Sequence, residues 1–353
     1  NKIQDINSVN KQQAVNIMNE LVDMGVRFDS RIDILSIFNN PGEISKEFFD
    51  DLVKYRNAVK NNIPIEDAFI PKFATGQSAI NNANVGDVFF VNDTNSLCIK
   101  LSNGKMQPLN ISAKAYLELF PPVERYATMQ NQSGDCYLVS TVDGMFKDPA
   151  ARATLLKCFT ENADGTIKVR IGDTSINFQG TYFGGVSHID GNYKYGGDFN
   201  VSGTSGMKML EEAFGFAYIS KYTERLQKIM SSYPPNSEKY KEAYDDYIKL
   251  QDPNYMTDHG AIARSNGGWM SDVYEIFGLE DIKTASTSSS ILTNPKNWDK
   301  YIFSAATNGN NDRIFINEDL QIAGGHAYNI EPFLDTDGNV MIKVTNPWSC
   351  ANN

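Results

Sequence analysis

The first part of the chain carries the apolar spacing of amphipathic helices. After Asn7 or Ser8, either of which can cap a helix, apolar residues recur every three or four positions. Two further helices are predicted, a short one over residues 31–38 and another capped by Ser45. Helices of about 10–16 residues joined by short polar links favour a small antiparallel bundle. We therefore expect a separate helical N-terminal region over residues 1–80.

Residues 81–111 change from helical spacing to an alternation of apolar and polar positions. Alternating runs predict three short strands, at residues 87–91, 97–101 and 106–109. Asn103-Gly104, between the last two runs, is typical of a tight hairpin turn, because both residues accept the positive φ that such turns require. We expect a linker and a β-meander that packs against the rest of the chain or bridges to it.

From about residue 112 to the end, helical and strand patterns are mixed, which predicts an α+β fold. The pattern predicts helices that begin at Cys136 and cover residues 239–250, and strands on both sides of a turn at 335–338. The helix at 239–250 lies in a long polar stretch, which is either a surface insertion or a lid bordering a binding site.

Length, charge and cysteine usage narrow the class of protein. The chain has 353 residues, more than a single hydrophobic core usually serves, which suggests two or three domains. A formal net charge of -11 argues against nucleic acid or an anionic membrane as partner. No window approaches the roughly 18 apolar residues of a membrane span. The four cysteines and three histidines are scattered singly, so we expect no disulfide framework, no metal site and no cofactor.

Cys136 lies in the most informative segment of the chain. Gly134 and Asp135 turn the backbone just before this cysteine, which then opens an apolar helical stretch. The positive end of a helix macrodipole favours the thiolate, which is the nucleophilic form. The side-chain amide of Gln130 and the backbone N–H of Cys136 could together bind the oxyanion of an acyl-transfer reaction. The alternative is a buried structural cysteine.

His326 and Asn346 are the candidate partners of this cysteine. His326 lies at the start of an alternating run, and Asn346 lies at the end of the next one. A hairpin through the turn at 335–338 would bring the two side chains together, so that the asparagine carbonyl accepts one imidazole N–H. The other ring nitrogen would then face Cys136, and Trp348 could shield the hydrogen bond from water. The alternative for His326 alone is a structural role.

These motifs resemble the calpain-type branch of the papain-like cysteine proteases. The matching segments are Gln130, residues 134–138, 325–328 and 346–348. Weaker matches lie at 210–214, where the family has a helix, at 267–271, and at 167–171 and 175–178, where it has strands. The resemblance covers roughly residues 112–350. It implies a papain-like two-lobed core, with a helical lobe over residues 112–255, an antiparallel-sheet lobe over residues 256–353, and the active site in the cleft between them.

The resemblance also implies the role of each site residue. Cys136 would be the nucleophile, Gln130 the oxyanion-hole donor, His326 the acid/base and Asn346 the residue that orients it. The substrate-binding candidates are Gly268, Gly325 and Trp348. The implied reaction is hydrolysis of a protein or peptide substrate through a thioester acyl-enzyme.

Two departures from the family pattern limit what carries over. The segment before Gln130 has two prolines and a single acid, and the chain stops soon after Asn346, so the acidic calcium loops of animal calpains have no counterpart here. A calcium-independent member of bacterial type is therefore implied. The polar stretch over residues 222–266 is also longer than the family usually shows.

Three questions stay open in the sequence. The same triad would serve a transglutaminase or deamidase, and a catalytically silent scaffold is the alternative outside enzymes. The N-terminal region would serve stability, dock a partner, or inhibit the enzyme intramolecularly by occupying the cleft. The chain starts at Asn1 rather than at methionine, so a signal peptide could have been removed, and the compartment of this soluble protein is left open.

Overall fold

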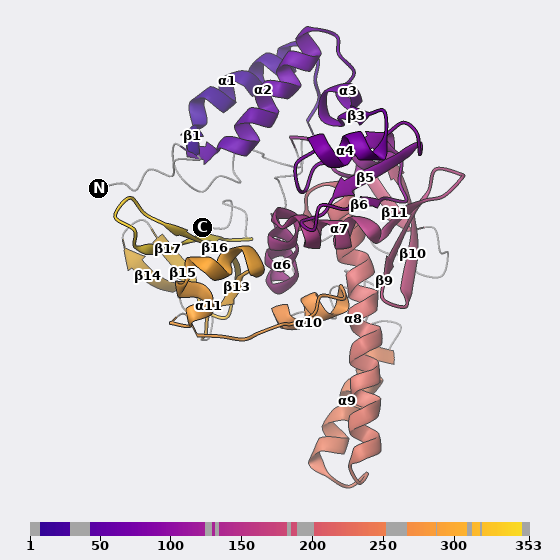
Figure 1. Ribbon diagram of the computed structural model, residues 1–353. Helices are drawn as coiled ribbons and strands as arrows, with labels where there is room; N and C mark the ends of the chain where they lie inside the picture. Colours follow the sequence, from indigo (N-terminus) through magenta and orange to yellow (C-terminus); the bar gives the residue numbers. More distant parts are fainter. Residues whose placement is uncertain are drawn as a thin grey trace.

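The computed structural model describes residues 8–28, 43–123, 129–130, 134–181, 185–188, 201–251, 267–286, 288–308, 313–317 and 320–347. These residues form a mixed α+β structure with several small sheets rather than one large one (Figure 1). The α+β class predicted from the sequence is confirmed. Among the described helices, none is long and apolar enough to cross a membrane.

The N-terminal region contains two helices that pack side by side (Figure 1). Its elements are β1 (Ser8–Asn10), α1 (Lys11–Asp23), β2 (Glu43–Ser45) and α2 (Lys46–Lys60). The apolar faces of α1 and α2 meet in a small core that includes Leu21, Phe48 and Leu52, together with Val123 from farther along the chain. The helical prediction for this region holds for α1 and α2, and the predicted helix over residues 31–38 lies outside the described residues.

The predicted start of the first helix is wrong by a few residues. Ser8, which was expected to cap the helix, instead pairs with Ser45 in the antiparallel β1–β2 ribbon, and α1 begins only at Lys11. The partner strand lies just before α2. A local capping pattern carries no information about a pairing with a distant segment, and here that pairing determines the backbone conformation.

The β-meander is confirmed and is part of a larger sheet. Its elements are α3 (Ile65–Phe69), β3 (Lys72–Phe73), α4 (Gly76–Asn82), β4 (Val88–Val91), β5 (Ser96–Lys100) and β6 (Met106–Pro108). The strand order is β3-β4-β5-β6, with β3 parallel to β4. One face buries Phe89 and Cys98 beneath α4, and the other carries Val88 and Leu97 into the main core. The meander therefore packs against the body of the molecule.

The main core lies among the elements that follow the meander. They are α5 (Ala113–Leu119), β7 (Met129–Gln130), α6 (Cys136–Lys147), α7 (Pro149–Lys157), β8 (Phe159–Glu161), β9 (Ile167–Ile171), β10 (Thr174–Thr181), β11 (Gly185–His188), β12 (Val201–Ser202) and α8 (Ser205–Ser232). Strands β11-β10-β9-β8 form an antiparallel sheet. The predicted helix at Cys136 and the predicted strands β9 and β10 are confirmed.

Helix α8 has two different halves. Its first eleven residues, Ser205 to Gly215, are all buried, including Lys208, Glu211 and Glu212. Its second half leaves the body and pairs with α9 (Glu238–Gln251), so that the two helices project as an arm (Figure 1). The helix predicted at residues 239–250 is thus confirmed, and it belongs to this arm.

The C-terminal part is mostly antiparallel sheet. Its elements are α10 (Met270–Ile276), α11 (Ser290–Thr293), a 3-10 helix (Pro295–Lys300), β13 (Ser304–Ala306), β14 (Arg313–Asn317), β15 (Leu320–Ala323), β16 (Ala327–Leu334) and β17 (Val340–Thr345). Strands β13-β16-β17 form one sheet and β14-β15 a separate ribbon. The predicted hairpin is β16–β17, closed by the turn in which Asp335 N–H donates to the carbonyl of Asn339.

Helix α6 joins the main core to this C-terminal sheet. Its apolar residues, among them Leu138, Val142 and Met145, belong to the same core cluster as Ala327 at the start of β16. Two polar contacts strengthen the junction: Asn329 Nδ2 donates to Asp143 Oδ2 at 2.6 Å, and Lys147 Nζ lies 2.5 Å from Glu331 Oε1. Helix α6 is therefore held against β16, and this positions the candidate site.

Candidate active site

Cys136 is the first residue of α6, as its sequence context predicts. Asp135 occupies the N-cap position, but its side chain accepts no hydrogen bond from the helix backbone. In the first turn, Leu138 and Val139 donate their N–H groups to the carbonyl of Asp135, whereas the first two N–H groups of the helix contact the side chain of Cys136. Its sulfur accepts hydrogen bonds from the backbone N–H groups of Ala327, Tyr137 and Cys136 itself. Because Ala327 directly follows His326, the sulfur lies against the segment that carries the candidate base.

The ionisation of this thiol differs from the expectation based on the helix terminus alone. Burial raises the pKa of the Cys136 thiol, the Ala327 N–H opposes the rise, and the charge of Asp135 adds to it. Burial also raises the pKa of Cys98, and it raises the pKa of Cys158 to about 12. The helix macrodipole was expected to favour the thiolate, but loss of solvent raises the thiol pKa instead, so the resting thiol is protonated.

His326 and Asn346 form the predicted pair. His326 lies just before β16 and Asn346 just after β17, so the antiparallel pairing brings them to the same end of the two strands. His326 Nε2 donates to Asn346 Oδ1 at 2.8 Å, since an amide oxygen can only accept. Tyr328 contacts the imidazole edge-to-face at a centroid distance of 4.8 Å. The hydrogen bond fixes the ring orientation and leaves Nδ1 as the nitrogen available for proton transfer.

The imidazole is buried, and this affects its charge. Burial lowers the pKa of His326, and the hydrogen bond to Asn346 opposes that change. The base is therefore neutral at neutral pH. A protonated thiol and a neutral imidazole are the forms from which general-base activation of a nucleophile starts.

Gln130 contacts the same end of the β16–β17 hairpin through its backbone. It lies on β7, which pairs with β12, and its side chain is buried. Its backbone N–H donates to the carbonyl of Pro347 at 2.7 Å, and Pro347 directly follows Asn346. The structure thus brings three distant segments together, carrying Gln130, Cys136 and the His326–Asn346 pair. Nothing in the local sequence pattern predicts the Gln130–Pro347 contact.

The predicted substrate-binding residues have different structural settings. The N–H of Gly267 donates to the carbonyl of Gly134 at 2.8 Å, so residues 267–268 lie beside the loop that leads into Cys136. A Cβ on Gly268 would lie 2.6 Å from the ring of Tyr137, so close packing is one reason for glycine there. Gly325 is exposed and has φ +63°, a left-handed conformation that favours glycine. Trp348 lies outside the described residues.

Two charged neighbours of the site were not predicted from the sequence. Asp135 contacts Glu211 on α8, and both side chains are buried. Both residues lie in segments that the resemblance singled out, but neither pattern predicts that they meet. Among the described residues, no group of three or more His, Cys, Asp or Glu side chains is arranged to hold a metal ion.

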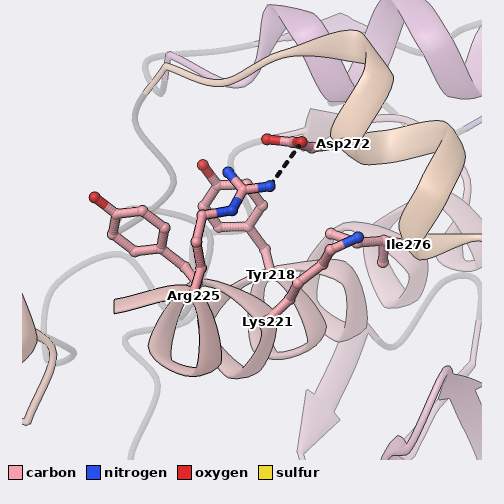
Figure 2. Close-up of a pocket in the computed structure, with 6 residues that line it drawn as sticks. Tyr218, Lys221, Arg225, Asp272 and Ile276 are labelled. Carbon is pink, nitrogen blue, oxygen red and sulfur yellow. Dashed lines mark hydrogen bonds and ion pairs between the residues drawn. The ribbon is translucent and has the colours of Figure 1, made fainter. Parts of the chain in front are cut away.

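A small surface pocket lies between α8 and α10, and Figure 2 shows it. Arg225 on α8 forms an ion pair with Asp272 on α10 at 3.4 Å, and Tyr218, Lys221 and Ile276 complete most of the lining. None of the candidate site residues lines this pocket. It marks the junction of the arm with the body rather than the candidate active site.

Comparisons with protein-family models, with curated proteins and with solved structures give no match to this chain. The inference about function therefore rests on the side chains that the fold brings together.

Proposed function

We propose that this protein is a cysteine endopeptidase with a papain-like, two-lobed core of the calpain type. The observation that carries the proposal is the arrangement of three segments around Cys136. Its sulfur accepts the N–H of Ala327, the preceding His326 is oriented by Asn346 at 2.8 Å, and Gln130 is tied to Pro347. A structural cysteine needs no neighbouring segment that carries an oriented imidazole.

In the acylation step, Cys136 attacks the carbonyl carbon of the scissile peptide bond. The thiol proton moves to Nδ1 of His326 as the carbon–sulfur bond forms, and the imidazolium then protonates the leaving amine as the carbon–nitrogen bond breaks. The products are a thioester on Cys136 and a free amine. Asn346 stabilises the transient imidazolium through its carbonyl oxygen, which accepts the Nε2 proton.

The oxyanion of the tetrahedral intermediate needs hydrogen-bond donors. The backbone N–H of Cys136, at the start of α6, is one, and the side-chain amide of Gln130 is the other. Loss of one such donor typically costs about 100- to 1000-fold in kcat. In deacylation, His326 takes a proton from water, the hydroxide attacks the thioester, and the proton returns to the Cys136 sulfur as the acid product leaves.

Several features favour a protein or peptide substrate. The backbone of residues 267–268 lies beside the loop before Cys136 and carries no side chain that would block an extended peptide. Gly325 leaves the surface before His326 open in the same way. The charge of -11 gives no basic face for nucleic acid. Calcium independence and intramolecular inhibition by the N-terminal region are further parts of the proposal.

The first experiment compares casein cleavage by the wild type, Cys136→Ala and Cys158→Ala, each with calcium and with a chelator. Cys158 is a matched control, since it is partly buried but lies at the end of α7. We expect cleavage by the wild type and Cys158→Ala, unaffected by the chelator, and none by Cys136→Ala. Casein cleavage by Cys136→Ala in a preparation free of other proteases would contradict the proposal.

The same samples separate the alternative functions. Release of ammonia from glutamine side chains without backbone cleavage would indicate a deamidase or transglutaminase with the same triad. A catalytically silent scaffold would turn over neither substrate. In that case iodoacetamide would label Cys136 no faster than Cys98 or Cys158, because an activated thiol should react first.

A further inference from the structure

Asp135 is a buried acid directly before the candidate nucleophile. Its side chain has 0% exposure, and it occupies the N-cap position of α6 without capping the helix. Among the described residues, neither of its carboxylate oxygens accepts a hydrogen bond from an N–H or hydroxyl group of another residue, and the only N–H that bears on the carboxyl group is its own backbone N–H. An aspartate at this position normally binds the free N–H groups of the first turn. Its carboxyl group is therefore engaged elsewhere.

The neighbour of this carboxyl group is a second acid. Glu211 lies on the buried half of α8 with 2% exposure, and its carboxyl group forms a hydrogen bond with that of Asp135. Helices α6 and α8 also contact one another nearby, where the ring centroids of Tyr137 and Phe214 lie 6.2 Å apart. A hydrogen bond between two carboxyl groups requires a proton, because two carboxylates have only acceptors.

The burial of both acids makes double ionisation unfavourable. Two carboxylates in contact within a desolvated site repel one another, so the pair retains a proton at a pH where isolated acids have lost theirs. Burial raises the pKa of Asp135, and its hydrogen bonds to Glu211 and to its own backbone N–H oppose the rise. Among the described residues, the titratable or charged groups nearest the pair along these elements are Cys136 and Tyr137 on α6, Lys208 and Glu212 on α8, His326 just before β16 and Tyr328 on β16.

We propose that Asp135 and Glu211 share one buried proton, and that this proton limits the negative charge beside the Cys136 thiol, which makes the two acids positioning residues for the nucleophile. This inference rests on the proposed role of Cys136. With the proton shared, the pair carries one negative charge rather than two. The carboxyl group of Asp135 also accepts no hydrogen bond from the first turn of α6, where the N–H groups of Cys136 and Tyr137 donate to the sulfur.

Two isosteric variants separate the charge from the shape of the pair. Asp135→Asn keeps a hydrogen bond to Glu211 and moves the remaining negative charge to Glu211, which does not adjoin Cys136 in the chain. Glu211→Gln keeps the same hydrogen bond and leaves the charge on Asp135. The measurement is the rate of iodoacetamide alkylation of Cys136 in the full chain as a function of pH, followed by mass spectrometry of the Cys136 peptide.

We expect the inflection of the Asp135→Asn profile to lie at lower pH than that of the wild type. The Glu211→Gln profile should lie at the wild-type position or at higher pH. A merely structural pair would move both profiles equally or not at all. Either of those results, or a shift to lower pH in Glu211→Gln alone, would overturn the proposal. Far-ultraviolet circular dichroism and the melting temperature check that each variant is folded, and Cys158 alkylation serves as the internal reference.

Failure of this inference is distinguishable from failure of the proposed function. Alkylation reports on the thiol whether or not the protein cleaves peptides, whereas the casein assay with Cys136→Ala reports on catalysis. Unchanged alkylation profiles with active proteolysis would remove the carboxyl pair from the mechanism and leave the endopeptidase in place. Shifted profiles without proteolysis would keep the pair as a control on Cys136 and remove the peptidase.

Discussion

Helix α6 meets its two neighbours through different polar groups. Against β16, the acids Asp143 and Glu331 are matched by the ammonium of Lys147 and the amide of Asn329. Against α8, the acids Asp135 and Glu211 face each other. The first group, called the balanced cluster below, consists of Asp143, Lys147, Asn329 and Glu331. It lies at the C-terminal end of α6 and holds this helix against the C-terminal sheet. The Asp135–Glu211 pair lies at the N-terminal end beside Cys136, where a perturbed ionisation can change the reactivity of the candidate nucleophile.

The largest expected effect comes from the tightly packed segment beside the Asp135–Glu211 pair. Gly268→Ala would place a Cβ 2.6 Å from the ring of Tyr137, which must shift. Overpacking of this kind typically costs about 1–3 kcal/mol, and we expect the upper part of that range together with a loss of activity. Urea denaturation measures the free energy of unfolding.

Gly165→Ala is the matched control for this clash. Gly165 has φ +81°, and a Cβ added there would meet nothing within 4 Å, so its substitution introduces backbone strain but no contact. We expect a cost of about 1 kcal/mol there. If Gly268→Ala destabilises the protein no more than Gly165→Ala, close packing is not what requires glycine at residue 268.

The next effect tests the balanced cluster. Asn329 is 2% exposed and its Nδ2 donates to Asp143 Oδ2 at 2.6 Å. Asn329→Ala removes a buried hydrogen bond to a charged group, and the free energy of unfolding should fall by about 1.5–2 kcal/mol. Asn339→Ala removes an exposed amide–carboxylate bond in the β16–β17 turn and is the control, with an expected cost of about 0.5 kcal/mol. Equal costs would mean that the junction contributes no special stability.

The Asp135–Glu211 pair should make the free energy of unfolding depend on pH. The pKa of Asp135 is raised in the folded protein, so the folded state keeps a proton that the unfolded chain loses above about pH 4. The contribution of Asp135 to stability is therefore fully present below its ordinary pKa and is lost as pH rises through the raised value. In Asp135→Asn this loss is absent, so the variant should gain stability relative to the wild type as pH rises from about 4 to about 8. A constant difference between the two melting curves across that range would contradict the raised pKa.

The smallest effect concerns the half-exposed lysine of the balanced cluster. Lys147 is 44% exposed and lies 3.0 Å from Asp143 Oδ2. Although burial acts to lower it, the pKa of Lys147 is raised by the charges of Asp143 and Glu331. Because solvent screens the pair, Lys147→Gln should cost only about 0.5–1 kcal/mol, and less at high salt. Lys249→Gln, at an exposed pair with Asp246, should cost almost nothing, and an equal cost at low salt would show that the cluster acts as ordinary surface charge.

The sequence predicted the elements whose patterns are local. The helix at Cys136 and the β4–β6 meander each follow from spacing and turn residues within a short window, and the β9–β10 strands were expected from the family resemblance. The meeting of His326 with Asn346 was also predictable, because one hairpin connects them and its turn chemistry is visible. The start of α1 was predicted wrongly because the β1–β2 ribbon joins segments on either side of an intervening stretch.

The sequence by itself determined which residues carry candidate chemistry and on which kind of element each lies. Only the tertiary structure decided which distant groups meet: Gln130 with Pro347, Gly134 with Gly267, and Asp135 with Glu211. It also decided the ionisation of Cys136, which the helix terminus alone would have made more acidic. The physical reason is the same in each case. Desolvation and long-range contacts depend on how the whole core packs, and no local pattern records that packing.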